Sequence, residues 1–173
     1  VEPRTPDGRI DLFDEALDAD TPEGLYVYQE DSASDDYPLA LISPATSRTI
    51  SSSLGELYEG PAAVEMHPAD AAERQIADRD TVRLYNAQGE VQCLVRVTDR
   101  VREGTLSLPK GLWRKSTFNG STANALAPDT LTDIGGGACF NDARVQAERV
   151  LAASFEGHDV TLAVSAESPS RAH

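Results

Sequence analysis

The sequence of 173 residues is long enough for one domain with a hydrophobic core and too short for two domains of ordinary size. Its formal net charge of −14 argues against nucleic acid or an anionic membrane as a partner. No run of about 18 apolar residues occurs, so we expect no membrane insertion. The chain begins with Val rather than Met, so we expect a piece of a longer protein. The sequence does not identify the cellular compartment of that protein, and we favour the cytoplasm.

The two ends of the chain differ in composition from its middle. Residues 1–36 are acidic and rich in Pro, Gly and Asp, which is typical of an extended lead-in from a preceding domain. Residues 37–150 hold the strand-like patterns and are expected to form the folded domain. Residues 151–173 contain one more possible strand, Asp159–Val164, before a tail rich in Ser and Pro.

Short strands with tight turns predominate between residues 37 and 150. The clearest alternation runs over residues 90–99, with an inward face formed by Val91, Cys93, Val95 and Val97. A continuous apolar run at Leu39–Ile42 predicts a strand buried on both faces. Further elements are expected as strands at Ala62–Met66, Thr81–Asn86, Thr105–Leu108 and Arg144–Val150, and as a short helix at Pro68–Arg74. This pattern indicates a mainly β fold, a small barrel, rather than alternating strands and helices.

Residues 110–140 are aperiodic and rich in groups that suit a polar ligand. The segment holds the only Trp, the only two Lys and the triple glycine Gly135–Gly137. Lys110, Arg114 and Lys115 form a cationic island in an acidic chain, which favours an anionic ligand. Upstream, the hydroxyls and guanidinium of residues 47–53 suit phosphate oxygens, although an ordinary solvated loop has the same composition.

Catalytic side chains are scarce, and no catalytic residue or metal ligand is assigned to this chain. We expect His67 to cap or pack beside the helix at Pro68; a small hydrolase using His67 and a nearby Asp is a less favoured alternative. Cys93 and Cys139 are too few for a disulfide framework and lack the spacing of metal ligands. Cys93 is expected in the core. No cation near Cys139 in the sequence would lower its pKa, so we expect a buried structural thiol.

Several sequence blocks, in a fixed order, resemble a known family. They are TPDGRIDLF (5–13), YPLALISPATSRTISS (37–52), VEMHPADAAERQIADRDTVRLYNAQGEV (64–91), PKGLW (109–113) and NALAPDTLTDIGGGACFNDARVQ (124–146). Together they resemble the C-terminal portion of molybdopterin oxidoreductases of the dimethyl sulfoxide reductase family. The resemblance implies a double-psi β-barrel with one or two short helices. That barrel would bind and orient a molybdopterin guanine dinucleotide in a molybdenum-dependent oxidoreductase. The preceding domains of the same enzyme would hold the molybdenum, so the isolated chain should not be catalytic.

The same resemblance implies a set of cofactor-binding residues. They would be Ser43, Ser47, Arg48, Ser51, Ser52, Trp113, Asn124, Asp133, Phe140 and Asn141. Arg48 and the nearby hydroxyls would contact phosphate or pterin oxygens, and Asn124 would hydrogen-bond through its amide. Trp113 is expected either to pack on a ring of the cofactor or to seal the barrel.

The sequence departs from the family pattern at one turn and at one expected contact. Gln75 and Arg79 stand where the family usually has Gly, at positions that often need φ > 0, so that turn is expected to be reshaped or strained. Ala127 replaces the Thr of the family's Asn-x-Leu-Thr, which removes a hydroxyl. These departures leave an alternative: a stand-alone β-barrel adaptor that binds a protein or peptide without a cofactor.

Overall fold

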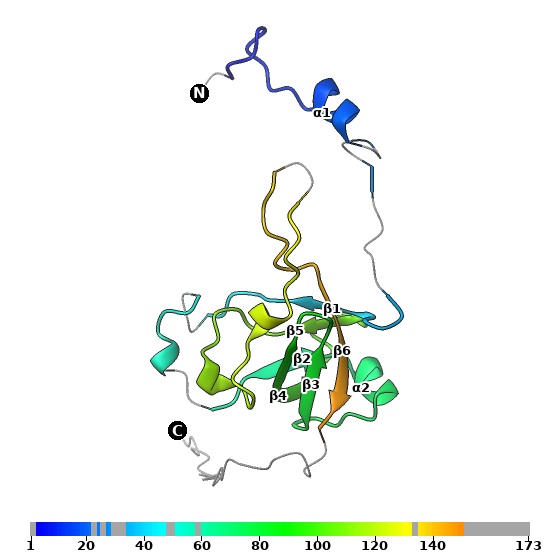
Figure 1. The fold of residues 1–173 in the computed structure, drawn as a ribbon, viewed down its shortest axis with the longest axis vertical. Helices are drawn as coiled ribbons and strands as arrows, with labels where there is room; N and C mark the ends of the chain where they lie inside the picture. The colour runs from blue at the N-terminus through cyan, green and yellow to red at the C-terminus, as the bar shows by residue number, and fades with distance from the viewer. Residues whose placement is uncertain are drawn as a thin grey trace, which may run out of the picture.

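The computed structural model describes residues 3–21, 24, 27–28, 34–47, 51–57, 60–132 and 135–150 (Figure 1). The elements in these ranges are α1 (Glu15–Asp20), β1 (Leu39–Ile42), η1 (Gly55–Leu57), β2 (Ala63–Met66), α2 (Pro68–Glu73), β3 (Thr81–Tyr85), β4 (Glu90–Val97), β5 (Thr105–Ser107), η2 (Arg114–Ser116), η3 (Ala123–Ala125) and β6 (Ala143–Arg149). Arg48, Asp133 and the possible strand Asp159–Val164 lie outside the described residues.

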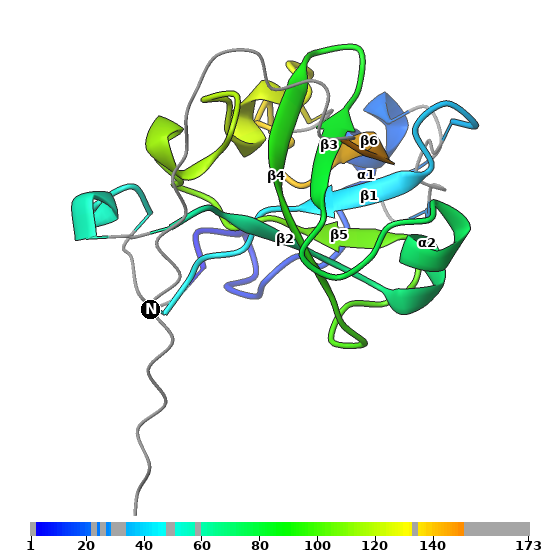
Figure 2. The same ribbon diagram turned by 90° about the horizontal axis from the view of Figure 1, so that it is seen from below.

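The strands close into a barrel in the order β1-β5-β2-β4-β3-β6. β1 pairs with β5, and β2 with β4, in parallel, while the other neighbours are antiparallel. Figure 2 shows β1, β5 and β2 crossing the barrel side by side, with β3 and β4 running at an angle to them. The prediction of a mainly β barrel with one or two short helices is confirmed. The two parallel pairs are consistent with the double-psi topology.

The core is built by the alternation that the sequence shows. Val91, Cys93 and Val95 of β4 are fully buried, and Val97 is partly buried and packs against the same core. Each such aliphatic side chain stabilises the fold by about 1.5–3 kcal/mol relative to an exposed one.

The expectation that β1 is buried on both faces is wrong. Leu39 and Leu41 are buried, but Ile42 is 38 % exposed. A strand in a closed barrel has one face inside and one outside, so it presents only alternate residues to the core. A continuous apolar run does not by itself distinguish that arrangement from double burial.

The two α-helices start at side-chain caps. Asp14 Oδ1 accepts hydrogen bonds from the backbone N–H groups of Ala16 and Leu17 at 2.9 and 3.1 Å, which explains α1 within a segment expected to be extended. The cap of α2 is His67, whose Nδ1 accepts the N–H of Ala69 at 3.2 Å. The expected capping role of His67 is confirmed.

The turn between α2 and β3 keeps the backbone that glycines would adopt. Gln75 has φ = 54° and Arg79 has φ = 68°. Non-glycine residues in this left-handed region are strained by about 1–2 kcal/mol each. Of the two expected outcomes, the strained turn is therefore the one observed.

Candidate functional site

A cavity of about 320 Å³ opens where β1 ends and β6 begins. Because β1 and β6 are antiparallel neighbours, the exit of one strand lies beside the entry of the other. The cavity is lined by Ser43, Lys110, Gly111, Ala123, Asn124, Ala127, Phe140 and Asn141. The fold thus gathers four of the predicted cofactor residues, Ser43, Asn124, Phe140 and Asn141, from three separate segments.

The orientation of the Asn141 amide is fixed by β1. The backbone N–H of Ser43 donates a hydrogen bond to Asn141 Oδ1 at 2.9 Å. This bond occupies the oxygen side of the amide and leaves Nδ2, a double donor, without an acceptor in the described part of the chain.

Asn124 is placed by a polar contact behind the cavity wall. The Asn86 side chain donates from Nδ2 to the carbonyls of Leu126 at 2.9 Å and Arg144 at 3.0 Å. Its Oδ1 accepts the N–H of Gln88 at 2.9 Å within the β3–β4 turn. Asn86 therefore joins this turn, the residue after η3 and the start of β6, and so holds Asn124 in register with the cavity.

Lys110 is a cation at the cavity that was not among the predicted cofactor residues. It is exposed and forms no ion pair with any described residue. Its backbone N–H donates to Pro44 O at 3.0 Å, which seats it beside the loop after β1. The signal for it was present in the sequence, because only two lysines occur in a chain of net charge −14.

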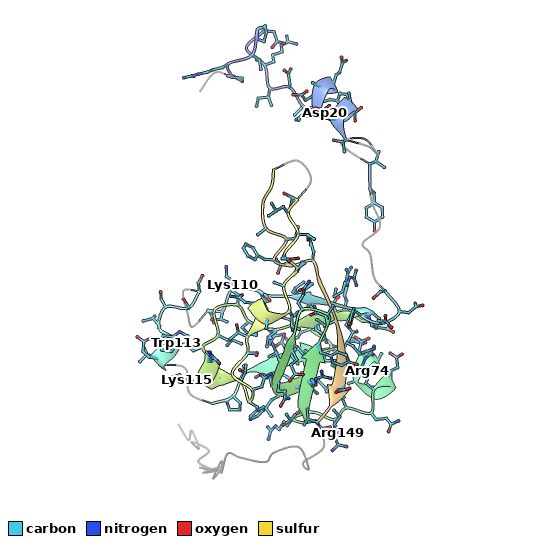
Figure 3. The ribbon with its side chains drawn as sticks, in the orientation of Figure 1. Asp20, Arg74, Lys110, Trp113, Lys115 and Arg149 are labelled. Carbon is cyan, nitrogen blue, oxygen red and sulfur yellow. The ribbon has the colours of Figure 1, made fainter. Side chains whose placement is uncertain are left out.

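The other lysine is engaged elsewhere. Lys115 Nζ donates to the carbonyl of Glu56 at 2.9 Å and lies 5.8 Å from the centroid of the Trp113 ring. Figure 3 shows Trp113 and Lys115 close together on one side of the barrel, with Lys110 set apart from them.

Trp113 fastens the loop that carries Ser51 and Ser52. Its Nε1–H donates to the Ser52 carbonyl at 2.7 Å, and its ring lies so close to Gly55 that an added Cβ there would be 2.2 Å from Nε1. Gly111 has φ = 74°, and a Cβ on it would be 2.2 Å from the Ser51 carbonyl. This close packing gives Trp113 a structural role; whether it also contacts a cofactor stays a prediction. Sequence reasoning missed Gly55 and Gly111.

The remaining predicted residues lie away from the cavity or outside the described part. Ser47 is exposed in a bend and does not line the cavity, and Arg48 and Asp133 lie outside the described residues. Cys139 is half-buried, so the expectation of a buried thiol is wrong. The reason is local, because Cys139 lies at the base of an exposed hairpin rather than in the barrel.

The described residues give little support to hydrolytic or metal chemistry. His67 Nδ1 accepts a backbone hydrogen bond as a helix cap. Burial raises the pKa of the Cys93 thiol to about 12, so this thiol stays protonated at neutral pH. No group of three or more His, Cys, Asp or Glu within the described ranges is placed to hold a metal ion. No helix in those ranges is long and apolar enough to cross a bilayer.

Comparison with known families matches the part of the chain that forms the barrel and its cavity. Residues 39–144 match the family described as "Molydopterin dinucleotide binding domain", a range that includes every residue lining the cavity. The chain belongs to this molybdopterin dinucleotide-binding family. The interpretation as an adaptor without a cofactor is therefore wrong.

Individual relatives of this dinucleotide-binding domain are much longer proteins. The chain is 31 % identical over 152 residues to "Probable oxidoreductase YoaE" of Bacillus subtilis (strain 168), covering 84 % of this chain and 22 % of the relative. It is 27 % identical over 170 residues to "Dimethyl sulfoxide reductase DmsA" of Escherichia coli (strain K12), covering 84 % and 21 %. The chain is thus a domain of a larger protein and spans about a fifth of these relatives.

A solved structure shares the fold. The structure "Acetylene Hydratase from Pelobacter acetylenicus" superposes with a TM-score of 0.67 at 17 % sequence identity, covering 84 % of this chain and 24 % of that one. At this identity the likeness shows the fold alone.

Proposed function

We propose that this barrel holds one end of a molybdopterin guanine dinucleotide in the cavity at the β1–β6 junction, as a domain of a larger molybdenum-dependent oxidoreductase. One observation carries the proposal. Two amide side chains, an aromatic ring and a lysine that has no carboxylate partner among the described residues converge on one cavity from distant parts of the sequence.

The groups at the cavity suit the chemistry of this cofactor. Guanine and pterin edges present adjacent donors and acceptors, which amides such as those of Asn124 and Asn141 can match. The Phe140 ring is 69 % exposed and offers an apolar face to a planar heterocycle. Lys110 supplies a positive charge for the diphosphate.

The size of the cavity limits what this domain holds. Its volume of about 320 Å³ lies at the lower end of ligand pockets, which span roughly 300–1,000 Å³. The cavity therefore takes one end of the dinucleotide, and the rest is contacted by other parts of the full-length protein. When bound, molybdenum supplies two-electron redox chemistry, while the residues of this chain bind and orient the dinucleotide.

The N-terminal arm, residues 3–21, supports membership of a larger protein. Ile10, Leu12, Phe13 and Leu17 are exposed, and none of the described residues before Leu39 is buried. A segment with this much exposed apolar surface is typical of an interaction site. We propose that the arm packs on a preceding domain, which agrees with the expected division at residue 36.

The two lysines provide a matched test. In the full-length protein, Lys110→Met should lower the content of molybdenum and of released guanine nucleotide, measured by mass spectrometry after denaturation. Lys115→Met removes the same charge five residues further along the chain, from a side chain that donates a hydrogen bond to the Glu56 carbonyl, and should leave cofactor content unchanged. Asn124→Ala should behave like Lys110→Met. Full cofactor content in both Lys110→Met and Asn124→Ala would overturn the proposal.

A further inference from the structure

The turn between β3 and β4 supports two walls of the cavity from behind, and none of its residues lines the cavity. The Nδ2 group of Asn86 donates to the Leu126 carbonyl at 2.9 Å and to the Arg144 carbonyl at 3.0 Å. Leu126 comes two residues after Asn124 in the sequence. Arg144 comes three residues after Asn141. One side chain therefore joins the two segments that carry the amides of the cavity.

The amide of Asn86 is held at both of its ends. Its Oδ1 accepts the backbone N–H groups of Gln88 at 2.9 Å and Gly89 at 3.3 Å, and its own backbone N–H donates to the Gly89 carbonyl at 3.0 Å. The oxygen is thus used within the turn, and both hydrogens of Nδ2 are used by the two carbonyls behind the cavity. A side chain held in this way sets the separation of those carbonyls.

A close contact at Gly89 independently ties the same turn to the segment of Asn124. A Cβ on Gly89 would lie 2.8 Å from the backbone carbonyl oxygen of Ala125, which is closer than a Cβ can approach without displacing its neighbour. Ala125 is the last residue of η3 and directly follows Asn124. Glycine is required here because two backbones meet. The turn therefore places η3 by direct contact as well as by hydrogen bonding.

We propose that Asn86 is a positioning residue for the cofactor, which holds Asn124 and Asn141 at a fixed separation so that both amides can contact the bound dinucleotide at once. The inference rests on the proposed function, because that function assigns these two amides to the dinucleotide. A site whose contact groups are placed before binding does not lose affinity to their ordering. Loss of the Asn86 contacts should therefore weaken cofactor binding, although Asn86 does not line the cavity.

Asn86→Asp in the full-length protein separates the two roles of this side chain. The carboxylate keeps an oxygen acceptor for the N–H groups of Gln88 and Gly89, but it loses both Nδ2 donors and faces two carbonyl oxygens. The purified protein should lose its bound guanine nucleotide, followed by chromatography, about ten times faster than the wild type, as expected when one or two hydrogen bonds to a ligand are misplaced. Gly89→Ala displaces Ala125 by steric contact, adds no charge and should change the rate in the same direction.

Asp70→Ala is the matched control at the other end of the barrel. Asp70 is buried in α2, and its Oδ2 accepts the N–H of Gly104 at 2.9 Å, so the variant also loses a side-chain hydrogen bond that holds a loop. Gly104 comes directly before β5, whereas Lys110 at the cavity comes after it. Asp70→Ala should release the nucleotide at the wild-type rate, even when its urea midpoint falls as far as that of Asn86→Asp.

Combined variants give a measurement that general destabilisation would not change. Because Asn86 acts partly through Asn124, Asn86→Asp should speed release only about threefold in Asn124→Ala, but by its full factor of about ten in Lys110→Met. Equal factors in both backgrounds overturn the positioning role, and so does a wild-type release rate in both Asn86→Asp and Gly89→Ala.

Failure of this inference can be told apart from failure of the proposed function. If Lys110→Met and Asn124→Ala lose cofactor while Asn86→Asp and Gly89→Ala keep it at the wild-type release rate, the positioning role alone is overturned. If all four variants keep full cofactor content, both proposals are overturned.

Discussion

The backbone N–H of Ser43 and the side-chain Oδ1 of Asn141 are joined by a hydrogen bond of 2.9 Å across a sequence separation of 98 residues. This bond connects the exit of β1 to the entry of β6 and forms one wall of the cavity. It therefore makes the shape of the binding site depend on closure of the barrel.

Replacing Asn141 should show whether the Oδ1 acceptor or the Nδ2 donors of its amide are needed for cofactor binding. Asn141→Ala removes both the acceptor for Ser43 and the donors toward the cavity, at a cost of about 1 kcal/mol for the lost hydrogen bond. We expect a lower guanine nucleotide content in the full-length protein, measured by chromatography after denaturation.

Asn141→Asp, compared with Asn141→Ala, separates the role of the Oδ1 acceptor from that of the Nδ2 donors. It keeps an oxygen for the Ser43 N–H but loses the Nδ2 donors and adds a negative charge beside an anionic cofactor. Its free energy of unfolding should stay near that of the wild type while its cofactor content falls. Normal cofactor content in Asn141→Asp would show that the Nδ2 donors do not contact the cofactor.

Gly55→Ala should displace the ring of Trp113. The new Cβ would lie 2.2 Å from Nε1 and 2.3 Å from Cδ1, so the ring must move and its bond to Ser52 must break. Overpacking of this kind costs about 1–3 kcal/mol. Because Trp113 is the only tryptophan of the 173-residue chain, its fluorescence should shift to longer wavelength as the ring enters water.

Gly135→Ala is the control for that measurement, since the nearest contact of its Cβ among the described residues would be Thr132 Oγ1 at 3.8 Å. It should leave both the emission spectrum and the urea midpoint of the 173-residue chain unchanged. An unshifted spectrum in Gly55→Ala would mean that the ring is not packed on Gly55.

Gln75→Gly and Arg79→Gly should each stabilise the fold by about 0.5–1 kcal/mol. Each relieves about 1–2 kcal/mol of left-handed strain and loses about 0.5–1 kcal/mol to the greater freedom of glycine in the unfolded chain. The Arg79 side chain is 89 % exposed and its 3.8 Å pairing with Asp78 contributes little. Urea denaturation measures the change. Arg79→Ala should bring no such gain, because alanine keeps the Cβ; equal gains for Gly and Ala would exclude backbone strain as the cause.

The Arg83–Glu90 pair should make stability fall in acid. The hydrogen bond from Arg83 lowers the pKa of Glu90 below its ordinary value of 4.5. A carboxylate with a depressed folded-state pKa contributes stability that is fully present above the unfolded value and is lost as the pH falls through the folded value. The contribution of Glu90 should therefore be fully present at pH 5 to 7, begin to decline near pH 4.5 and be gone once the pH lies below the lowered folded-state pKa.

Melting temperatures measured from pH 7 to pH 3 isolate this effect if Glu90→Gln is run in parallel, because other carboxylates titrate in the same range. The difference between the two proteins should shrink toward acid. A difference that stays constant with pH would assign the effect of the variant to packing instead.

Local features of the barrel could be predicted because they repeat within a few residues. The alternation at Val91, Cys93 and Val95 identified the inward face of β4, and Pro68 after His67 identified the start of α2. Burial on both faces of β1 was wrong because composition alone does not say how many sides of a strand are covered.

The site was predictable only through the family resemblance. Ser43, Asn124 and Asn141 come from three segments, and no periodicity links them. Lys110 carried a compositional signal, whereas the need for Gly55 and Gly111 follows from contacts with Trp113 and Ser51 that only the tertiary structure shows.

The position of β1 in the barrel has a consequence for biosynthesis. β1 pairs with β5 through Ala40 and Thr105, and with β6 through Leu39 and Val145, so its second partner is synthesised after all the other described strands. Such distant pairings fold slowly and leave strand edges open in the meantime. Since Ser43 and Asn141 meet only when β6 docks, this wall of the cavity cannot form before β6 has been synthesised, and a chain truncated before β6 would expose the unpaired edges of β1 and β3 to aggregation.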